Sequence, residues 1–269
     1  MVPKYLVLAY AITPIHVGAG KSSTGVVDSP LVRDSIGYPI VYGSSLKGSL
    51  KSFLIAKNES LAKCVFGGKP EEENILTSKY VLTDLIPVFY PVSSIDEGYI
   101  YITTRYLINH IEDLMSRLGI GSLYKESKEK SEVRIFLGKI STELSLQLSD
   151  EVRSLGNLIK DKNRVYVLDN SIGLSAVESA LTRVTRTELD DNTKTSKNIW
   201  SEEYIPQGTI LLSGIFEREI SNSYCEELNR NNVNIDNEFL KLIDNVSVFI
   251  GGKESIGKGL TKIKLKRVS

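Results

Sequence analysis

Residues 5–20 read YLVLAYAITPIHVGAG, and this stretch decides the fold. Residues 5–13 are almost all aliphatic, aromatic or β-branched without clean alternation, which is typical of a strand buried on both faces. A loop rich in Gly and Pro then runs to Gly43, and apolar residues recur at helical spacing after it. With Ser44 as the N-cap, this spacing predicts a helix that ends near Lys57. The chain therefore begins as a strand, a Gly-rich loop and a helix.

The remaining chain mixes predicted strands and helices. Helical periodicity is found over residues 107–118 and 176–181, and the charged residues 121–132 are typical of a loop. Strands are predicted at residues 81–92, 99–104, 144–148, 165–168, 209–216, 246–250 and 260–268. Because the two kinds of element do not alternate strictly, the fold class is α+β. One domain, residues 1–269, is expected, with the polar residues 181–207 projecting as an arm.

The composition is that of a globular protein of 269 residues. The 33 Lys and Arg balance the 33 Asp and Glu, and 41% of the residues are hydrophobic, which together exclude disordered and fibrous classes. Cys64 and Cys225 lack C-x-x-C spacing and are expected to be free thiols in a reducing compartment, the cytoplasm. His16 and His110 are the only histidines, so any catalytic metal would be held mainly by carboxylates. The longest apolar run, residues 5–12, is shorter than the roughly 20 residues of a membrane helix, so no membrane partner is expected.

The C-terminal segment is basic. From Lys253 to Arg267 there are six basic residues and one acid, Glu254. Such a stripe suits a nucleic-acid contact, and it equally suits a solvated strand edge protected by lysines.

Three segments offer backbone amides near a lysine, the chemistry that binds phosphate oxygens. They are residues 16–24, 43–48 and 252–259. The first contains Gly-Lys-Ser, but Ile15 stands where a nucleotide-binding P-loop needs Gly, and no helix is expected directly after either of the two Gly-rich loops. A free-standing nucleotide hydrolase that depends on Lys21 is therefore an alternative class. Three such elements together favour a polynucleotide backbone as the ligand, although each alone is also compatible with a plain turn or cap.

Asp28 is the acid best placed for chemistry, in the loop GVVDSP near His16. A carboxylate there could hold a divalent ion or help to deprotonate a 2′-hydroxyl that attacks the adjacent phosphate. Asp28 could instead cap its own loop, and His16 could be a structural side chain rather than a proton shuttle.

The motifs resemble, in unbroken order, those of RAMP-superfamily backbone subunits of type III CRISPR effectors. The similarity is greatest to the repeated backbone nuclease of the type III-B (Cmr) complex. It is carried by residues 13–20, 25–34, 37–39, 43–48, 64–67, 89–93, 182–187, 193–195, 202–208 and 251–259.

The resemblance implies a ferredoxin-like, RRM-like core with an inserted thumb hairpin at about residues 181–207 and a Gly-rich C-terminal loop. Several copies would stack along a CRISPR guide RNA together with other Cmr subunits. Each thumb would displace one nucleotide of the duplex between guide and target RNA.

The resemblance also assigns residues. Asp28 occupies the place of the family's cleavage aspartate and would bind Mg²⁺ or Mn²⁺, cutting target RNA at regular intervals to leave a 2′,3′-cyclic phosphate, with His16 as the second catalytic candidate. The expected RNA-binding residues are Arg33, Ser44, Ser45, Lys47, Lys51, Arg183, Arg186, Lys253 and Lys258. Two alternatives stay open: a non-catalytic guide-binding scaffold and the equivalent type III-A (Csm) subunit.

Overall fold

The first strand, β1 (Val2–Ala11), lies inside a large mixed sheet in the computed structural model of the chain. The structure describes residues 1–20, 27–68, 77–135, 138–162, 164–190, 192–219 and 221–268, and Lys21 lies outside them. The other strands of this sheet are β2 (Tyr80–Leu82), β3 (Ile86–Ser94), β4 (Gly98–Thr104), β5 (Tyr124–Ser127), β6 (Ser131–Ile135), β7 (Gly138–Thr142), β8 (Ser145–Leu148), β9 (Arg164–Leu168), β12 (Ile210–Glu217), β13 (Val246–Phe249) and β14 (Leu260–Arg267).

The sheet runs in the order β13-β14-β1-β12-β3-β4-β9-β8-β5, with β2 beside β12 and β6 beside β3 and β7. β1 is antiparallel to both of its neighbours, so that Leu8 faces Leu212 on one side and Lys264 on the other. Within the described residues, β13 and not the basic strand β14 is the last strand of the sheet on this side of β1. β14 pairs with β13 only over Leu260–Ile263, so Lys264, Lys266 and Arg267 lie where β14 has a strand partner on one side alone, and protection of a strand edge by these cations stays an alternative.

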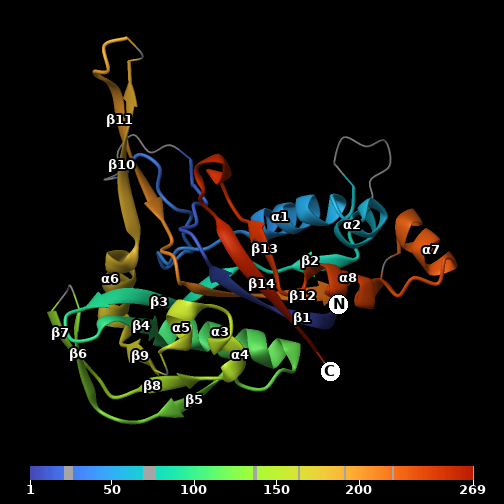
Figure 1. The fold of residues 1–269 in the computed structure, drawn as a ribbon. Coiled ribbons are helices and arrows are strands. Elements are labelled where there is room, and N and C mark those ends of the chain that lie inside the picture. Colours follow the sequence, from blue (N-terminus) through green and yellow to red (C-terminus); the bar gives the residue numbers. More distant parts are fainter. Residues whose placement is uncertain are drawn as a thin grey trace.

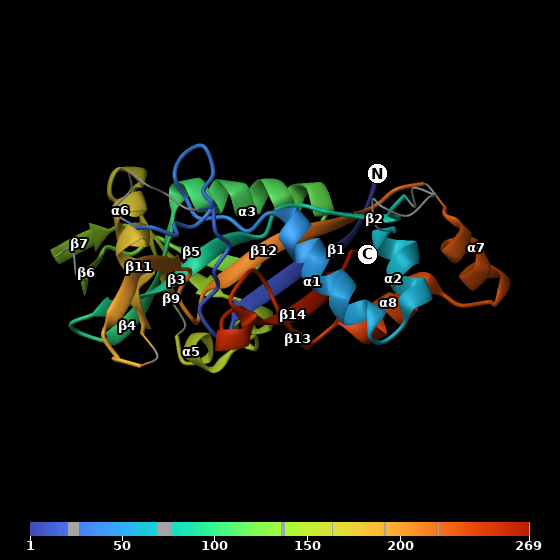
Figure 2. The ribbon, with the colours of Figure 1, turned by 90° about the horizontal axis from the view of Figure 1, so that it is seen from above.

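Helices cover both faces of the sheet, as the apolar character of residues 5–13 predicts. They are α1 (Gly43–Ile55), α2 (Glu59–Phe66), α3 (Arg105–Leu118), α4 (Asp150–Arg153), α5 (Asn157–Lys160), α6 (Asn170–Ala180), α7 (Ser223–Arg230) and α8 (Ile235–Ile243). Tyr5 and Val7 pack into the core under α1 and α8, whereas Leu6 and Leu8 pack into the core under α3, α4 and α5. In Figure 1, α1 lies on one side of the sheet and α3 to α5 on the other, and Figure 2 shows α1 and α3 lying along it.

Helix α1 begins one residue before the expected N-cap. Its N-cap is Tyr42, which makes no side-chain capping bond, and the Gly43 amide donates to Asp84 Oδ1 at 2.7 Å. A carboxylate from the connection between β2 and β3 thus occupies this end of the helix, and the prediction of Ser44 as N-cap is wrong.

Three other predictions need correction. Residues 81–92 form two strands, β2 and β3, because the chain turns at 83–85 to bring Asp84 to α1. Residues 121–132 are not a loop, since they include β5 and the start of β6. The helix expected at 176–181 begins earlier, at Asn170.

The arm expected at residues 181–207 contains a hairpin of its own. β10 (Thr182–Leu189) and β11 (Ser196–Tyr204) pair only with each other as strands of a two-stranded antiparallel sheet within the described residues. Figure 1 shows the hairpin projecting away from the large sheet.

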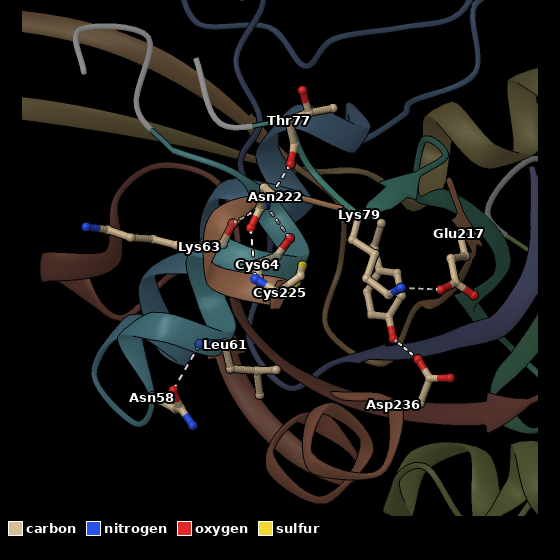
Figure 3. The surroundings of a disulfide bond; sticks show 11 residues. Asn58, Leu61, Lys63, Cys64, Thr77, Lys79, Glu217, Asn222, Cys225 and Asp236 are labelled. Atoms are coloured by element: carbon tan, nitrogen blue, oxygen red, sulfur yellow. Dashed lines mark hydrogen bonds and ion pairs between the residues drawn. A yellow bond between two sulfur atoms is a disulfide. The ribbon is translucent and has the colours of Figure 1, made fainter. Parts of the chain in front are cut away.

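The two cysteines form a disulfide, so the expectation of free thiols is wrong. Cys64 on α2 and Cys225 on α7 are 161 residues apart, but the two helices pack together and bring the buried side chains into contact. Beside them, the amide of Asn222 donates to the carbonyl oxygens of Cys64 and Thr77 at 3.1 and 2.9 Å and its oxygen accepts from the Cys225 amide (Figure 3). No helix in the described ranges is long and apolar enough to cross a membrane.

Replacing both Cys64 and Cys225 by Ser is expected to lower the free energy of unfolding by about 2 to 5 kcal/mol, because the cross-link restricts the unfolded chain over a long loop. Thermal unfolding with and without a reductant measures the effect. The melting temperature of the native chain should fall on reduction, and that of the double variant should not respond. A fully reduced native chain with an unchanged melting temperature would contradict the prediction.

Candidate functional site

The loop after β1 runs along the base of the hairpin. Ser29 forms a parallel bridge with Glu202, its amide donates to the Ser201 carbonyl at 3.0 Å, and its carbonyl accepts from the Glu203 amide at 3.2 Å. The loop is therefore added beside β11 like a short third strand, which fixes Asp28 against the hairpin.

The Asp28 carboxylate is exposed to solvent but held by one residue of β11. Its Oδ2 accepts from both the amide and the hydroxyl of Ser201, each at 2.7 Å. These bonds, the backbone amide first, lower the pKa of Asp28 below its ordinary value. The carboxylate is thus ionised at neutral pH. Asp28 does not cap its own loop through this oxygen, because its partner lies 173 residues away.

His16 is buried beside this loop. Its Nδ1 lies 2.7 Å from the Glu203 carbonyl oxygen, which can only accept, so Nδ1 carries a proton. Its Nε2 lies 3.4 Å from the Ser29 hydroxyl. Both ring nitrogens thus contact the residues that position Asp28, and a catalytic role for His16 stays a prediction.

Two adjacent glutamates, Glu202 and Glu203, are almost fully buried where β11 ends. Glu202 accepts from the Lys253 ammonium, from the Tyr204 hydroxyl and from Trp200 Nε1, the last at 2.6 Å. Burial opposes its ionisation, but hydrogen bonds from Lys253, Tyr204 and Trp200 outweigh burial and hold the pKa of Glu202 at about 2.

Glu203 and Glu178 of α6 hold two arginines that were expected to bind RNA. Arg33 pairs with Glu203 at 2.7 Å and with Glu178, and Arg183 pairs with Glu203 at 3.0 Å and with Glu178 at 2.9 Å. Arg186 pairs with Glu202 at 3.1 Å. The arginine donors are therefore largely used inside the protein, and direct RNA contact by them stays a prediction.

A cavity of about 460 Å³ opens between Asp28 and the upper part of the hairpin. Its walls are formed by Asp28, Ser29, Glu188, Asn198, Ile199, Trp200 and Lys253. The structure thus brings Asp28 and Lys253, from opposite ends of the sequence, to one site.

A second hollow, a groove of about 570 Å³, joins two other expected RNA-binding elements. One wall is the small-residue face of α1, with Ser45 and Ser49, and the opposite wall includes Gly251 and Gly252 of the C-terminal loop. Their shared groove was not evident from the sequence.

Most amides of the expected phosphate-binding loops are already bonded. The Gly252 amide donates to the His16 carbonyl at 2.8 Å, and a Cβ on Gly251 would lie 2.2 Å from the same oxygen, so these glycines serve close packing. The amides of Gly257 and Lys258 donate within the loop. These described amides are therefore not free, and the lysines of the same segments stay candidates for phosphate binding.

The lysines differ in their surroundings. Lys47 on α1 is half-buried, and burial, then Lys51 and Arg218, lower the pKa of its ammonium. Lys51 donates to the Gly68 carbonyl at 2.9 Å, and the Lys258 ammonium lies 5.2 Å from the centre of the Tyr204 ring. The clustering of Lys47 with two other cations favours an anionic ligand at this point.

The described residues contain no group of three or more His, Cys, Asp or Glu side chains arranged to hold a metal ion. Asp28 can still provide one carboxylate ligand. Mg²⁺ is commonly held by one or two carboxylates, with water and substrate phosphate completing its shell, so the donor set fits a metal that RNA helps to bind.

Glu178, Ser201, Glu202 and Glu203 were missed as site residues. The Glu202-Glu203 pair lies within a quoted motif, but a pair of charges in a polar arm is more commonly solvated than buried.

Comparison with known proteins places the chain. The family model of the RAMP superfamily matches residues 9–262. The chain belongs to the RAMP superfamily. Among members that it resembles are the "CRISPR system Cmr endoribonuclease Cmr4" of Pyrococcus furiosus, 28% identical with 98% of this chain and 96% of the relative covered, and the "CRISPR system CMR subunit Cmr4" of Saccharolobus solfataricus, 26% identical with 94% of each covered.

Solved structures of RAMP proteins agree with this membership. A chain of the type III-B Cmr-beta complex bound to cognate target RNA aligns with a TM-score of 0.70 at 25% identity, covering 97% of this chain and 96% of that one. Oligomeric Cmr4 from Pyrococcus furiosus aligns with a TM-score of 0.69 at 24% identity and complete coverage of both chains, which shows the same fold. The expected resemblance to type III-B subunits is confirmed.

The Glu202→Gln variant of this RAMP chain is expected to lose about 2 to 3 kcal/mol of unfolding free energy at neutral pH, because the folded state lowers the pKa of Glu202 from 4.5 to about 2. A carboxylate with a lowered pKa stabilises the fold above its unfolded pKa and loses that effect as the pH falls through its folded pKa. The difference should therefore shrink between about pH 4.5 and pH 2. Urea unfolding over this range measures it.

The Glu227→Gln variant, which changes an exposed carboxylate on α7, is the matched control and should leave stability nearly unchanged. A Glu202→Gln difference that stayed constant with pH would show that the ionised form of Glu202 is not what stabilises the hairpin base.

Proposed function

We propose that this chain is a backbone subunit of a type III-B CRISPR-Cas ribonucleoprotein that binds guide CRISPR RNA in multiple copies and cleaves complementary target RNA at regular intervals. The observation that carries the proposal is the ionised Asp28, fixed by Ser201 at the mouth of a cavity. The full-length similarity to a Cmr endoribonuclease supports the same activity.

The cleavage step uses groups of the RNA itself. The 2′-hydroxyl loses its proton and its oxygen attacks the adjacent phosphorus. The 5′-oxygen of the next nucleotide leaves and takes a proton from solvent water, so that a 2′,3′-cyclic phosphate and a 5′-hydroxyl result. Asp28 would take the 2′ proton or bind a divalent ion, Mg²⁺ or Mn²⁺. When bound, such an ion would neutralise charge that develops on the phosphate oxygens. His16 and Ser29 keep the loop of Asp28 in place.

The arrangement of strands supports a ferredoxin-like core for the subunit. The antiparallel order β14-β1-β12-β2, with α1 between β1 and β2 and with α7 and α8 between β12 and β14, is that of a split βαβ fold. The hairpin of β10 and β11 would be the thumb that displaces one nucleotide of the duplex. The whole chain would act as one domain.

Guide binding would depend on stacking of copies. The net charge of the chain is zero, and several of its site cations are paired with buried carboxylates, so a lone copy should hold RNA weakly. A filament of copies, together with other Cmr subunits, adds weak contacts along one RNA. The cytoplasm, where guide and target RNA meet, would be its location.

In the assembled complex, Asp28→Ala and Asp28→Asn are expected to reduce cleavage of guide-complementary RNA at least 100-fold while leaving guide and target binding intact, because they remove the carboxylate alone. Mapping the cut sites in the presence of Mg²⁺ or Mn²⁺ measures both rate and spacing. All of the evenly spaced cuts should be lost in complexes that contain either variant.

Ser201→Ala is the graded control, because it removes the hydroxyl and leaves the backbone amide that also holds Asp28. It should slow cleavage by less than Asp28→Ala. Full cleavage by the Asp28 variants would instead support the scaffold alternative, with the active carboxylate on another subunit.

Lys47→Ala is expected to weaken guide RNA binding several-fold at all sequences and to reduce the slope of log affinity against log salt by about 1, as loss of one phosphate contact does. Lys57→Ala, which removes an exposed lysine beyond the other end of α1, is the matched control and should change neither quantity. Equal effects of the two variants would remove α1 from the guide-binding surface.

A further inference from the structure

The disulfide ties a peripheral helix to the rest of the chain. Helix α7 lies at one end of the molecule in Figures 1 and 2, where it packs against α2 and α8. Its outer face is exposed, whereas Cys225 on its inner face is buried and bonded to Cys64. A short helix with one exposed face is the kind of segment that opens locally while the remaining fold stays closed. The cross-link therefore acts on a segment that can open by itself.

The main chain of Cys64 joins two further segments at the same point. Its carbonyl oxygen accepts from the Asn222 side chain at 3.1 Å (Figure 3). The same oxygen accepts from the Lys79 amide at 3.3 Å, and the Lys79 carbonyl in turn accepts from the Arg218 amide at 2.8 Å. The residue that carries the disulfide thus also helps to position Arg218, which directly follows β12.

The end of α2 also contacts α1. Two residues after this helix ends, the Gly68 carbonyl accepts from the Lys51 ammonium at 2.9 Å. After burial, Lys51 and Arg218 are the causes that lower the pKa of Lys47, so both cations lie close enough to repel its ammonium. Like charges separate unless other contacts hold them together. The segments that the disulfide joins therefore keep three cations side by side.

We propose that the disulfide between Cys64 and Cys225 is a redox-sensitive device that sets the affinity of α1 for an RNA backbone. When it is closed, Lys47, Lys51 and Arg218 stay together and bind phosphate as a group. When it is reduced, α7 separates from the end of α2, the cations move apart, and phosphate affinity falls. This inference rests on the proposed function, because it takes guide RNA to be the ligand of α1.

The opening step needs a dithiol reductant, such as a protein of the thioredoxin class. Both cysteines are buried, so a thiolate reaches a sulfur atom only after α7 has moved away from α2. This thiolate attacks one sulfur, and the other leaves as a thiolate. The second thiol of the reductant then displaces the cysteine that is held in the mixed disulfide. Two electrons and two protons pass to the chain, which gains two thiols, while the reductant becomes a disulfide.

The test compares guide RNA binding by the full native chain before and after reduction with dithiothreitol, well below the melting temperature. Thiol labelling shows when reduction is complete. Binding should become several-fold weaker, and the slope of log affinity against log salt should fall by about 1 to 2, as loss of one or two phosphate contacts does. Emission of Trp200, the only tryptophan, should not change, because the hairpin lies away from α7 (Figure 1).

Variants test the route from the disulfide to α1. The chain with both Cys64→Ser and Cys225→Ser should bind guide RNA like the reduced native chain and should not respond to dithiothreitol. Arg218→Gln should bind more weakly and lose at least half of the redox response, because one of the cations that moves is gone. Arg230→Gln, which removes an exposed cation of α7 itself, is the matched control and should keep the full response.

The native chain alone decides the inference, even where the double serine variant folds poorly. Equal affinity of the oxidised and reduced chains would overturn it and leave the disulfide as a structural cross-link. A loss of affinity together with a change in Trp200 emission would also overturn it, because such a loss reflects general unfolding.

Target cleavage separates this inference from the proposed nuclease. Guide binding that depends on the disulfide, without any target cleavage by the native complex, would support the redox device and place catalysis elsewhere. Regular cuts together with guide binding that does not depend on the disulfide would keep the nuclease and refute the device.

Discussion

The ion pairs of Glu202 and Glu203 fix the position of the hairpin relative to the rest of the chain. These two buried carboxylates, one on each face of β11, bind cations from three other segments: Arg33 in the loop after β1, Arg183 and Arg186 on β10, and Lys253 in the C-terminal loop. A two-stranded ribbon is marginally stable in water, so its direction has to be imposed at its base. Removal of one partner would leave a buried charge uncompensated, and the arrangement therefore tolerates little change.

The same pairs explain why the site is rigid without being strongly basic. Burying charges requires close partners, and the partners in this case are cations that would otherwise face solvent. Lys47, in contrast, lies beside Lys51 and Arg218, and no described acid forms an ion pair with it. The cations of the hairpin base are thus paired with buried carboxylates, whereas Lys47 on α1 has no ion-pair partner among the described residues.

The sequence predicted the central elements because their patterns are local. The doubly apolar residues 5–13, the helical spacing after Gly43 and the polar arm at 181–207 all correspond to observed elements. The features that the sequence did not predict depend on residues that are far apart in the chain. They are the bond of Asp84 to the start of α1, the disulfide between Cys64 and Cys225, and the hydrogen bonds from Ser201 to Asp28. No spacing rule encodes such contacts. The unpredicted helices α2, α7 and α8 did carry a readable signal, since each has an Asn whose side chain caps it.

The pairing of Asp28 with Ser201 also determines when, during synthesis, the Asp28 carboxylate is held in position. During synthesis, Asp28 leaves the ribosome 173 residues before its partner, which corresponds to roughly 10 to 35 s at usual elongation rates. Throughout this interval the carboxylate is present but lacks β11, and the cavity wall formed by the hairpin does not exist. The connectivity of the fold therefore delays the held position of Asp28 and the cavity beside it until the hairpin has formed.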